Sequence, residues 1–535
     1  MTDTCPVLVA GAGPTGLTLA CDLLASGVAV RVVDRAAGPA STSRALGLQP
    51  RGVEVLDRAG ALGDLEQRSN PVRLVSVDLG GRTTARLQLG QRTKLVTRPG
   101  LIVSQAEIEG GLRRRLAQLG GTVEWGREVL DAHQDGEGVA VQLSDGRAMR
   151  CEWLVGCDGA HSRVRKVAGI GFPGVQIIER FLLADVHADL PVARDTVLVW
   201  LHGEEMLAAF PLPEADLWRL MAPAPDDAGD DLGPQVVLSL LTRRLHERTG
   251  WPASALGTAE WTSTFRIHRR LADRFRQGRI LLAGDAAHIH SPVGGQGLNT
   301  GVGDAENLAW KLALVVHQRG APTLLDSYEA ERRPIAAEVL ESTSAMTRMV
   351  VGESRLARVL RDRVFVPSLN HRLVQRLIWE QASQLKVSYR SGPLAARSRH
   401  PFLRPRPGDR VPDLTCRRLD GSATRLHAEL GARWVLLTPP ASTPPAALAT
   451  QSCIDLTRQR LGADLVTVLA PTGRRHGPHL LLVRPDAHLG WRGSPAPAAL
   501  EGWLTGVLDD GHVVRGRSRF MGSRHERTLT GAVGP

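Results

Sequence analysis

The stretch that decides the fold is residues 7–24, VLVAGAGPTGLTLACDLL. Its first four residues form a short apolar run, and the leucines and alanines after Gly16 recur at helical spacing, so it predicts a strand, a turn and a helix. Gly11 permits the tight turn, Gly13 lets the backbone approach a pyrophosphate, and Gly16 lets the helix pack closely on the strand. Free N–H groups at the start of the helix attract phosphates. The segment therefore predicts a dinucleotide-binding unit in an α/β fold.

A second strand follows directly and ends in an acidic residue. Residues 28–33 are mostly apolar and lead to Asp34, about twenty residues past the glycines, where a carboxylate accepts hydrogen bonds from an adenosine ribose. We expect Pro14, Thr15 and Arg35 to belong to the same site. A glycine-rich turn without a ligand is the alternative, and the strand, helix and Asp34 in register weaken it. NAD and FAD share the ADP moiety, so this segment does not separate them.

A segment far downstream predicts the other end of the site. Residues 279–283 (RILLA) read as a buried strand that delivers Gly284 and Asp285 at its carboxyl end, where open α/β sheets bind ligands. A glycine-rich loop follows over residues 291–300, and an amphipathic helix runs from there to about Val316. The start of such a helix stabilises negative charge, which the pyrimidine ring of a reduced flavin carries and a nicotinamide does not. We therefore expect the two segments to meet around one FAD.

Four motifs in the same order and spacing extend over roughly residues 1–345: the Gly11–Gly16 turn with Asp34, residues 157–160 (CDGA), Gly284 through Asn299, and residues 325–334 (LDSYEAERRP). On these motifs the chain resembles the class A FAD monooxygenases, the para-hydroxybenzoate and phenol hydroxylase group. Residues 43–47, residues 103–107 and the C-terminal extension are similar to those of bacterial hydroxylases that tailor aromatic polyketides, such as the anthracycline and angucycline hydroxylases.

The resemblance assigns FAD contacts position by position. It implies that Asp34 binds the adenosine ribose and that Asp285 binds the ribityl chain. Asp158 would lie near the pyrophosphate and be linked to NAD(P)H use, although a turn residue at the end of a strand is an equal alternative. Further contacts to FAD are implied for Arg44, Gln105, Pro292, Gly295, Gly297, Leu298 and Asn299. Of these, Arg44 and Pro292 are the candidate catalytic residues, through their positions at the flavin.

The middle of the chain predicts an antiparallel sheet. Residues 180–187, 195–202, 206–212 and 216–221 read as strands joined by short polar turns. In the resembling family such a sheet covers the substrate cavity in front of the flavin. This implies four candidate pocket walls, for each of which ordinary core packing is the alternative: Trp200, Met206, Phe210 and Trp218.

The C-terminal part predicts a further domain. A Pro/Arg-rich stretch after His400 suggests a linker, and the His-Pro and Gly-Asp-Arg-Val-Pro segments resemble those that introduce the thioredoxin-like domain of phenol hydroxylases. It has no Cys-x-x-Cys pair, so we expect packing or assembly and no disulfide exchange. The expected architecture is α/β, with a Rossmann-like FAD-binding domain, a β-sheet substrate domain and a thioredoxin-like domain, over residues 1–178 with 265–400, 179–264 and 401–535.

Composition limits the partners. Hydrophobic residues make up 43% of the 535-residue chain, no apolar run is long enough to span a bilayer, and the N-terminus lacks the pattern of a signal peptide, so we expect a cytoplasmic protein. The net charge of +11 comes from arginines interleaved with acids, which argues against a nucleic-acid partner. The six scattered cysteines argue against disulfides and a metal site. His288 has no partner at metal-ligand spacing and is expected to be structural. A monomer or homodimer is expected.

These expectations combine into one reaction. The resemblance implies that NAD(P)H reduces the flavin, that O2 forms a flavin C4a-hydroperoxide, and that its terminal oxygen hydroxylates a polycyclic, polyketide-type aromatic compound in antibiotic biosynthesis. The protein would position the ring and exclude water. Baeyer–Villiger insertion or an oxidative rearrangement on a polyketide is one alternative, and a flavin-binding module without turnover is another.

Overall fold

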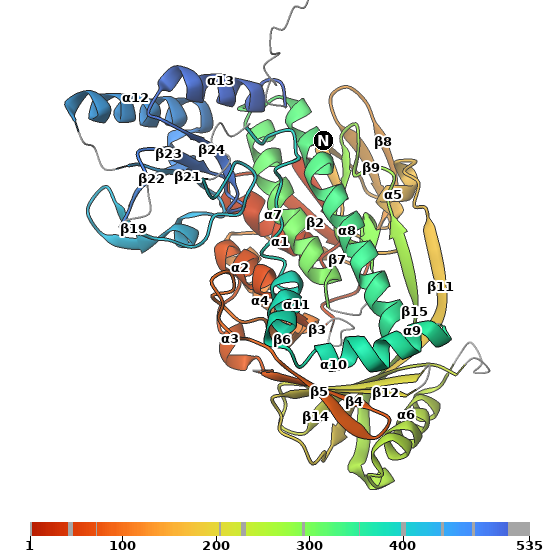
Figure 1. Cartoon of the computed structure of the whole chain (residues 1–535). Coiled ribbons are helices and arrows are strands. Elements are labelled where there is room, and N and C mark those ends of the chain that lie inside the picture. The colour runs from red at the N-terminus through yellow and green to blue at the C-terminus, as the bar shows by residue number, and fades with distance from the viewer. Residues whose placement is uncertain are drawn as a thin grey trace, which may run out of the picture.

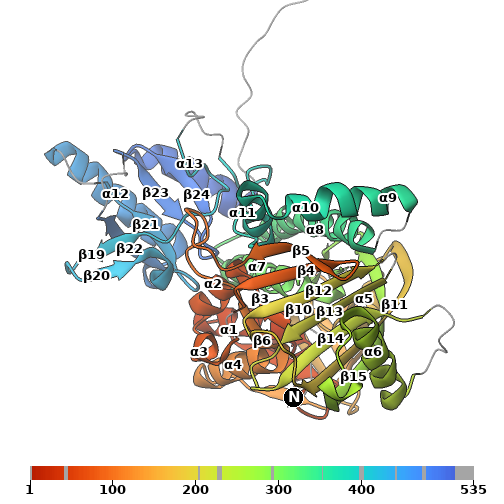
Figure 2. The same cartoon turned by 60° about the horizontal axis from the view of Figure 1, so that its bottom comes forward.

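The computed structural model describes residues 3–40, 46–70, 72–202, 205–225, 232–290, 295–351, 354–396, 403–439, 443–472 and 477–511. Three large sheets and one two-stranded sheet organise these residues (Figure 1). The second sheet and the C-terminal domain lie on different sides of the first sheet and its helices, as the turned view confirms (Figure 2). No helix within these ranges combines the length and the apolar character needed to cross a membrane.

The first sheet carries the predicted dinucleotide-binding unit. Strand β1 lies at its centre and pairs in parallel with β2 and β10, and β10 pairs in parallel with β17. The carboxyl-terminal halves of β1 and β10 and all of β17 are buried, so these parts read as continuous apolar runs. Helices α1 and α7 pack against each other beside this sheet. The bounds are β1 (Asp3–Ala10), α1 (Pro14–Ala25), β2 (Val30–Asp34), β7 (Val123–Trp125), β10 (Ala148–Gly156), β16 (Arg276–Gln277), β17 (Ile280–Leu282) and α7 (Gly297–Val316).

Additional strands and helices complete the first region. Strands β8 and β9 extend the first sheet from β10, and β3 pairs with β6 in a separate two-stranded sheet. The bounds are β3 (Leu46–Leu48), α2 (Pro50–Ala59), α3 (Leu65–Arg68), β6 (Leu101–Ser104), α4 (Gln105–Gln118), β8 (Val129–Gln134), β9 (Val139–Leu143) and α5 (Arg163–Val167).

The second sheet is larger than the predicted one. The expected strands pair antiparallel as anticipated, but β12 also pairs in parallel with β4, and the hairpin β4–β5 adds an edge from residues 74–88. The turn at Gly80-Gly81 is a strong hairpin signal that the expected range 179–264 leaves out. The bounds are β4 (Leu74–Leu79), β5 (Arg82–Gln88), β11 (Gly174–Ala188), β12 (Thr196–His202), β13 (Glu205–Pro211), β14 (Leu217–Pro223), β15 (Leu256–Leu271) and β18 (His288–Ile289).

Helices cover both faces of this second sheet. Helix α6 packs on β11, β14 and β15, while α8 and α10 approach the opposite face. The bounds are α6 (Pro234–Thr249), α8 (Asp326–Val351), α9 (Arg355–Leu360), α10 (Val366–Ser368) and α11 (Arg372–Ala382). The face toward α8 and α10 is the one that looks toward the first sheet (Figure 2).

The C-terminal domain has its own six-stranded sheet, in the order β20-β19-β22-β21-β23-β24. Trp434 joins this domain to the rest, because it lies edge-on to Trp310 of α7; within the domain it lies edge-on to Trp503 of α13. The α/β class with a thioredoxin-like C-terminal domain is confirmed. The bounds are β19 (Thr415–Arg418), β20 (Ala423–Arg425), β21 (Trp434–Leu437), α12 (Pro444–Leu461), β22 (Val466–Pro471), β23 (Leu480–Val483), β24 (Leu489–Gly493) and α13 (Pro497–Leu508).

Candidate active site

The glycine turn and the Gly284 segment meet in space. Strands β1 and β17 both run parallel to β10, so their carboxyl ends lie at the same edge of the first sheet. There the Thr15 side chain packs so closely on Gly284 and Gly301 that a Cβ added at either glycine would lie 2.6 or 2.4 Å from Thr15 Oγ1. Two segments about 270 positions apart therefore form one surface.

The three glycines of the turn have different surroundings. Gly11 has φ +107°, and a Cβ there would lie 2.3 Å from the carbonyl oxygen of Cys157. A Cβ at Gly16 would lie 2.0 Å from the carbonyl oxygen of Gly11, so both glycines serve packing within the protein. A Cβ at Gly13 would meet no atom within 4 Å. Gly13 thus leaves open the space that a pyrophosphate needs above the start of α1, and the turn fits the ADP part of FAD.

Of the two charged residues at the end of β2, only Asp34 is held by backbone groups. Asp34 accepts hydrogen bonds from the N–H groups of Ala12 (2.7 Å) and Ala36 (2.8 Å), which fixes its carboxylate beside the turn. Arg35 is exposed and lies 4.0 Å from Glu128, at the limit of an ion pair.

Asp158 binds the first turn of α5, whose N-cap residue is Ser162. Its Oδ2 accepts hydrogen bonds from the N–H groups of Arg163 (2.7 Å) and Val164 (3.1 Å) at the start of α5. These bonds fit the interpretation of Asp158 as a turn residue, although its buried Oδ1 has no hydrogen-bond partner among the described residues.

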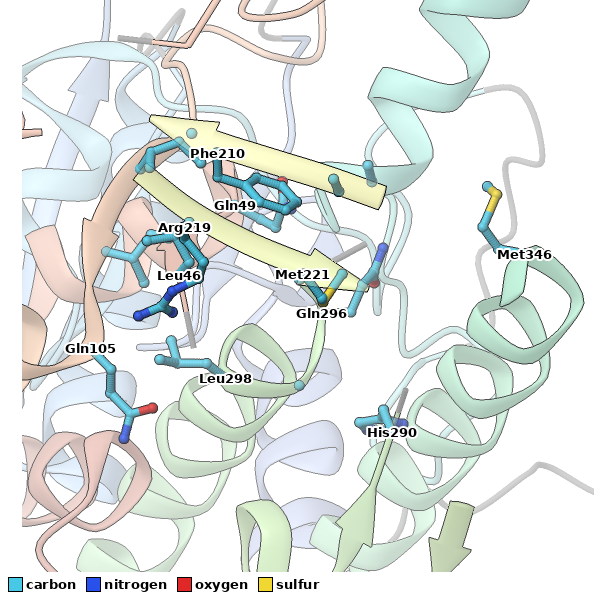
Figure 3. A pocket seen from close by; sticks show the side chains of 18 of the residues that line it. Leu46, Gln49, Gln105, Phe210, Arg219, Met221, His290, Gln296, Leu298 and Met346 are labelled. Atoms are coloured by element: carbon cyan, nitrogen blue, oxygen red, sulfur yellow. The ribbon is translucent and has the colours of Figure 1, made fainter. Parts of the chain in front are cut away.

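A cavity of about 1270 Å³ extends from this edge to the second sheet. Drug-sized ligands usually occupy about 300–1000 Å³, so the cavity has room for part of a cofactor and for a substrate beside it. Its first-sheet end includes seven of the predicted cofactor contacts: Pro14, Thr15, Gln105, Asp285, Gly295, Gly297 and Leu298. Leu298 and Gln296 come from the start of α7, across from the strands that carry Phe210 and Met221 (Figure 3).

The second sheet supplies the apolar wall. Met206 and Phe210 line the cavity, together with Ala208 of the same strand β13. Their neighbours on the wall are Val197, Val199, Arg219 and Met221. Arg219 is buried and pairs with Asp185 through two contacts of 2.7 Å.

Trp200 and Trp218 are not among the described residues that line the cavity. Both are buried on the opposite face of the sheet, in the apolar cluster that packs on α6, where Trp200 lies edge-on to Trp251. The reason is the alternation of side chains along a strand: Trp200 follows Val199 and Trp218 precedes Arg219, so they point the other way. The expectation that these two tryptophans form pocket walls is corrected accordingly, and the alternation itself was the signal that could have shown it.

The loop before α7 is braced by Asn299. This residue is 1% exposed; its Oδ1 accepts a hydrogen bond from the Gln49 N–H, and its Nδ2 donates one to the Gly295 carbonyl, both at 2.8 Å. Asn299 therefore shapes the loop without itself lining the cavity. Gln105 does line it and donates to Glu109 at 2.8 Å. Arg44 and Pro292 lie outside the described residues.

Asp285 places a carboxyl group in the cavity wall. It opens to the cavity, yet protein atoms surround it on the other sides, and this burial raises the pKa of its carboxyl group, with the nearby Asp304 adding to the effect. A carboxyl group here suits the hydroxyls of a ribityl chain, because it can accept or donate hydrogen bonds.

A polar chain behind the cavity escaped sequence reasoning. Nε2 of His290, which lines the cavity, is 2.8 Å from Nδ1 of His288, and Nε2 of His288 is 2.6 Å from Asp304 Oδ2. Asp304 also accepts hydrogen bonds from Arg332 Nε (2.7 Å) and the Gly284 N–H (3.1 Å). Burial opposes ionisation of Asp304, but His288 and Arg332 hold its pKa at about 2. His288, expected to be structural, is thus one member of a hydrogen-bonded series.

Comparisons with known proteins agree with this geometry. Residues 4–343 match the family described as FAD binding domain, and residues 404–510 match the aromatic-ring hydroxylase C-terminal family. The chain is 40% identical to 6-methylpretetramide 4-monooxygenase of Streptomyces rimosus over 66% of this chain and 63% of that protein. It is 36% identical to 12-dehydrotetracycline 5-monooxygenase/anhydrotetracycline 6-monooxygenase of Streptomyces rimosus subsp. rimosus, over 91% and 95% of the two chains.

A solved structure extends the similarity. Aklavinone-11 hydroxylase, in a ternary complex with FAD and aklavinone, superposes with a TM-score of 0.76 at 27% identity, covering 95% of this chain and 100% of that one. The similarity therefore includes all three sheet regions.

Proposed function

Because this chain belongs to the FAD-dependent aromatic monooxygenases, we propose that it hydroxylates a polycyclic phenol of the polyketide type, with NAD(P)H as reductant and O2 as oxidant. One observation carries the proposal: a single cavity joins the Gly11–Gly16 and Asp285 edge of the first sheet to the apolar wall of the second. Such a cavity holds a flavin at one end and an aromatic substrate at the other.

Bound FAD would supply the reactive oxygen after reduction. We assign its ADP part to the Gly11–Gly16 turn. There Gly13 leaves space for the pyrophosphate, and the Asp34 carboxylate lies beside the turn, where it would bind the ribose. Asp285 would bind the ribityl chain, and the loop from Gly295 to Asn299 would lie along the ring system, with Pro292 and Arg44 as its further predicted contacts. Pro14, Thr15, Gly16, Arg35, Gln105, Asp158 and Gly284 complete the proposed cofactor site.

The substrate wall favours a broad, flat, mostly apolar compound. Met206, Ala208 and Phe210 offer apolar surface, and the cavity is larger than a single-ring phenol requires. By name, one relative acts on 6-methylpretetramide and another on 12-dehydrotetracycline and anhydrotetracycline, and the similar solved structure contains aklavinone. Enclosure by α8 and α11, which contribute Met346 and Trp379 to the lining, would keep water from the reaction.

We propose a corresponding division of the chain. Residues 1–178 and 265–400 would bind FAD, residues 179–264 would hold the substrate, and the thioredoxin-like residues 401–535 would stabilise the assembly. The β4–β5 hairpin belongs to the substrate sheet, since β4 pairs with β12 and Val75 and Leu87 line the cavity.

The experiment is an NADPH oxidation assay on the purified protein. We expect a yellow preparation that releases FAD on denaturation and oxidises NADPH several-fold faster when anhydrotetracycline is added as a probe phenol. Mass spectrometry should show a product heavier by one oxygen atom, and its fragmentation separates a new hydroxyl from a lactone. A protein that binds no flavin, or whose NADPH oxidation responds to no multi-ring phenol, would contradict the proposal.

A further inference from the structure

The short helices after α8 expose apolar side chains on their outer surface. We call residues 355–382, which contain α9, α10 and α11, the helix row. Among the described residues, twelve large aliphatic side chains are strongly exposed, and six of them lie in the helix row, with exposed fractions of 45–78%: Leu356, Val359, Leu360, Val364, Leu373 and Leu377. Single exposed leucines are common, but a group of them marks a surface that meets an apolar partner.

The spacing of these side chains gives each half of the helix row an outer and an inner side. The outer side chains recur every four residues, which places them on one side of a helix: Leu356, Leu360 and Val364 in the first half, Leu373 and Leu377 in the second. The inner side packs into the apolar cluster shared with the second sheet: Phe365, Val366, Leu369, Val374 and Ile378. The outer leucines and valines are therefore additional to the core.

The helix row lies along the outside of the molecule. Figure 2 shows α11, α10 and α9 one after another above β4 and β5. Two amide side chains attach the row to the edge strand β5, because Asn370 donates to the Thr84 carbonyl at 2.8 Å and Gln375 donates to the Arg86 carbonyl at 2.9 Å. The row is thus braced on the substrate sheet, and its outer side faces away from that sheet.

Arginines accompany the exposed leucines. Residues 355–377 contain six arginines and a single acidic residue, Asp362, which pairs with Arg361 at 2.6 Å. Arg355, Arg363 and Arg372 are exposed. A long arginine side chain can lie along an apolar surface while its guanidinium group stays at the polar boundary. The outer side of the row therefore combines apolar area with positive charge.

This combination matches the surface of an anionic lipid bilayer. Leucines of a surface-bound helix enter the boundary between headgroups and acyl chains, and neighbouring arginines bind the phosphates of the headgroups. A second copy of the chain is a poorer match, because a two-fold interface would set the positive surface of one copy against the same surface of the other. Charge complementarity thus favours lipid over self-association.

We propose that the helix row binds anionic phospholipid bilayers and holds the substrate cavity close to the membrane surface. Helix α11 carries both surfaces: Leu373 and Leu377 are exposed, whereas Gln375, Ile378 and Trp379 line the cavity. An α-helix is about 10 Å across, so one helix separates the bound lipid from the cavity. An apolar polycyclic compound dissolved in the bilayer would then be concentrated beside its binding site. Lipid binding goes beyond the proposed function, because it requires no reaction.

The test is co-sedimentation of the FAD-loaded full chain with vesicles of equal parts phosphatidylglycerol and phosphatidylcholine. We expect the protein to bind these vesicles, to bind pure phosphatidylcholine vesicles at least tenfold more weakly, and to dissociate as salt is raised from about 0.1 M to about 0.5 M. Absence of binding to the phosphatidylglycerol vesicles at low salt would overturn the inference.

Two variants test the charged and the apolar parts of the row separately. Arg355→Gln/Arg363→Gln/Arg372→Gln should lower the partition coefficient onto anionic vesicles by at least about tenfold, because each arginine near the surface adds to the attraction. Leu356→Ser/Leu373→Ser should lower it by a similar factor, because it removes apolar area that lipid would bury. FAD content and the unfolding midpoint should match the wild type, since all five side chains are exposed.

Matched controls substitute equally exposed side chains elsewhere. Arg114→Gln/Arg147→Gln/Arg243→Gln removes three arginines that are 56–63% exposed, and Leu419→Ser/Leu448→Ser removes two leucines of the C-terminal domain that are 71–72% exposed. Both controls should bind vesicles within about twofold of the wild type. Equal loss of binding in the control and row variants would overturn the inference, because net charge or total apolar surface would then explain the binding.

Analytical ultracentrifugation of the same proteins distinguishes the other occupant. A wild-type dimer that Leu356→Ser/Leu373→Ser dissociates, together with absence of vesicle binding, would overturn the inference and assign the helix row to a contact between copies. Failure of the wild type to hydroxylate any phenol would contradict the proposed function and leave lipid binding unaffected, so the two proposals fail in different experiments.

Discussion

The two sides of helix α7 place buried polar groups under opposite conditions. Its N-terminal end borders the cavity, where Asp285 opens to the lining and Nδ1 of His290 has no partner among the described residues. Its far side meets the C-terminal domain through a set of charged and polar side chains that we call the interface network: Asn307, Lys311, Glu331, Arg484 and Asp486. All five are at most 3% exposed. The polar groups at the cavity are available to bind a ligand, whereas the paired groups of the interface network hold the C-terminal domain in place.

Pairing in the interface network is dense around one carboxylate. Glu331 accepts hydrogen bonds from Arg484 at 2.7 and 2.8 Å, from Lys311 at 2.8 Å and from Asn307 at 2.8 Å. Burial opposes its ionisation, yet Arg484 and Lys311 hold the pKa of Glu331 at about 2. A buried pair of this kind adds little net stability over an apolar contact. Removing one partner is strongly destabilising, because it leaves the other charge buried without a counter-charge.

Glu331→Gln should therefore have the largest effect on stability. The substitution keeps the shape of the side chain and leaves two buried cations short of a carboxylate, so we expect the free energy of unfolding to fall by about 3–5 kcal/mol. Urea unfolding followed by tryptophan fluorescence measures it. Arg425→Ala is the control, since it removes an exposed ion pair with Asp413 and should change stability by at most about 1 kcal/mol. Equal effects of the two substitutions would show that the interface network is not holding the domain.

Local signals explain what could be predicted from the sequence. The Gly11–Gly16 turn, the apolar strand before it and the Gly284-Asp285 strand end are each encoded within a few residues, so their structures and their meeting point follow from motif and sheet geometry. The face of the second sheet to which each side chain points is also encoded locally. Strict alternation along the strand would have placed Trp200 and Val199 on opposite faces. The Gly80-Gly81 turn is a local signal for the β4–β5 hairpin. Its place in the second sheet is not encoded locally, because β4 pairs with β12, more than a hundred residues away.

Long-range pairing explains what could not be predicted. Glu331 and Arg484 are 153 positions apart, and Asp304 and Arg332 are 28 apart, with nothing in the surrounding residues to couple them. His288 could be recognised as a buried histidine, but its partner Asp304 lies about two turns inside a helix whose start is a separate motif. The hydrogen-bonded series His290–His288–Asp304 and the interface network therefore emerge only once α7, α8 and the C-terminal domain are packed together.

Phe210→Ala sharpens the comparison on the cavity side. Phe210 is only half-buried and faces the lining, so its loss removes contact with a flat substrate and affects stability less than Glu331→Gln does. We expect KM for a multi-ring phenol to rise about tenfold, equivalent to about 1.4 kcal/mol of binding. Steady-state kinetics with anhydrotetracycline measures it. Trp200→Phe, on the opposite face of the sheet, should leave KM unchanged, and a rise in KM for this control alone would reverse the assignment of the two faces.

Gly13→Ala should have the smallest effect on folded stability and still weaken FAD binding. Its φ of −74° suits alanine and the added Cβ meets nothing within 4 Å, so folded stability should change by less than about 1 kcal/mol. If the pyrophosphate passes over this position, the methyl group occupies its path, and the Kd for FAD should rise about tenfold in a fluorescence titration of the apoprotein. Gly502→Ala is the matched control, because Gly502 is equally open but lies in α13 of the C-terminal domain. Unchanged FAD affinity in Gly13→Ala would mean that the coenzyme does not lie in the open space above the turn. Asp285 would then be the one remaining basis for placing the coenzyme in the cavity.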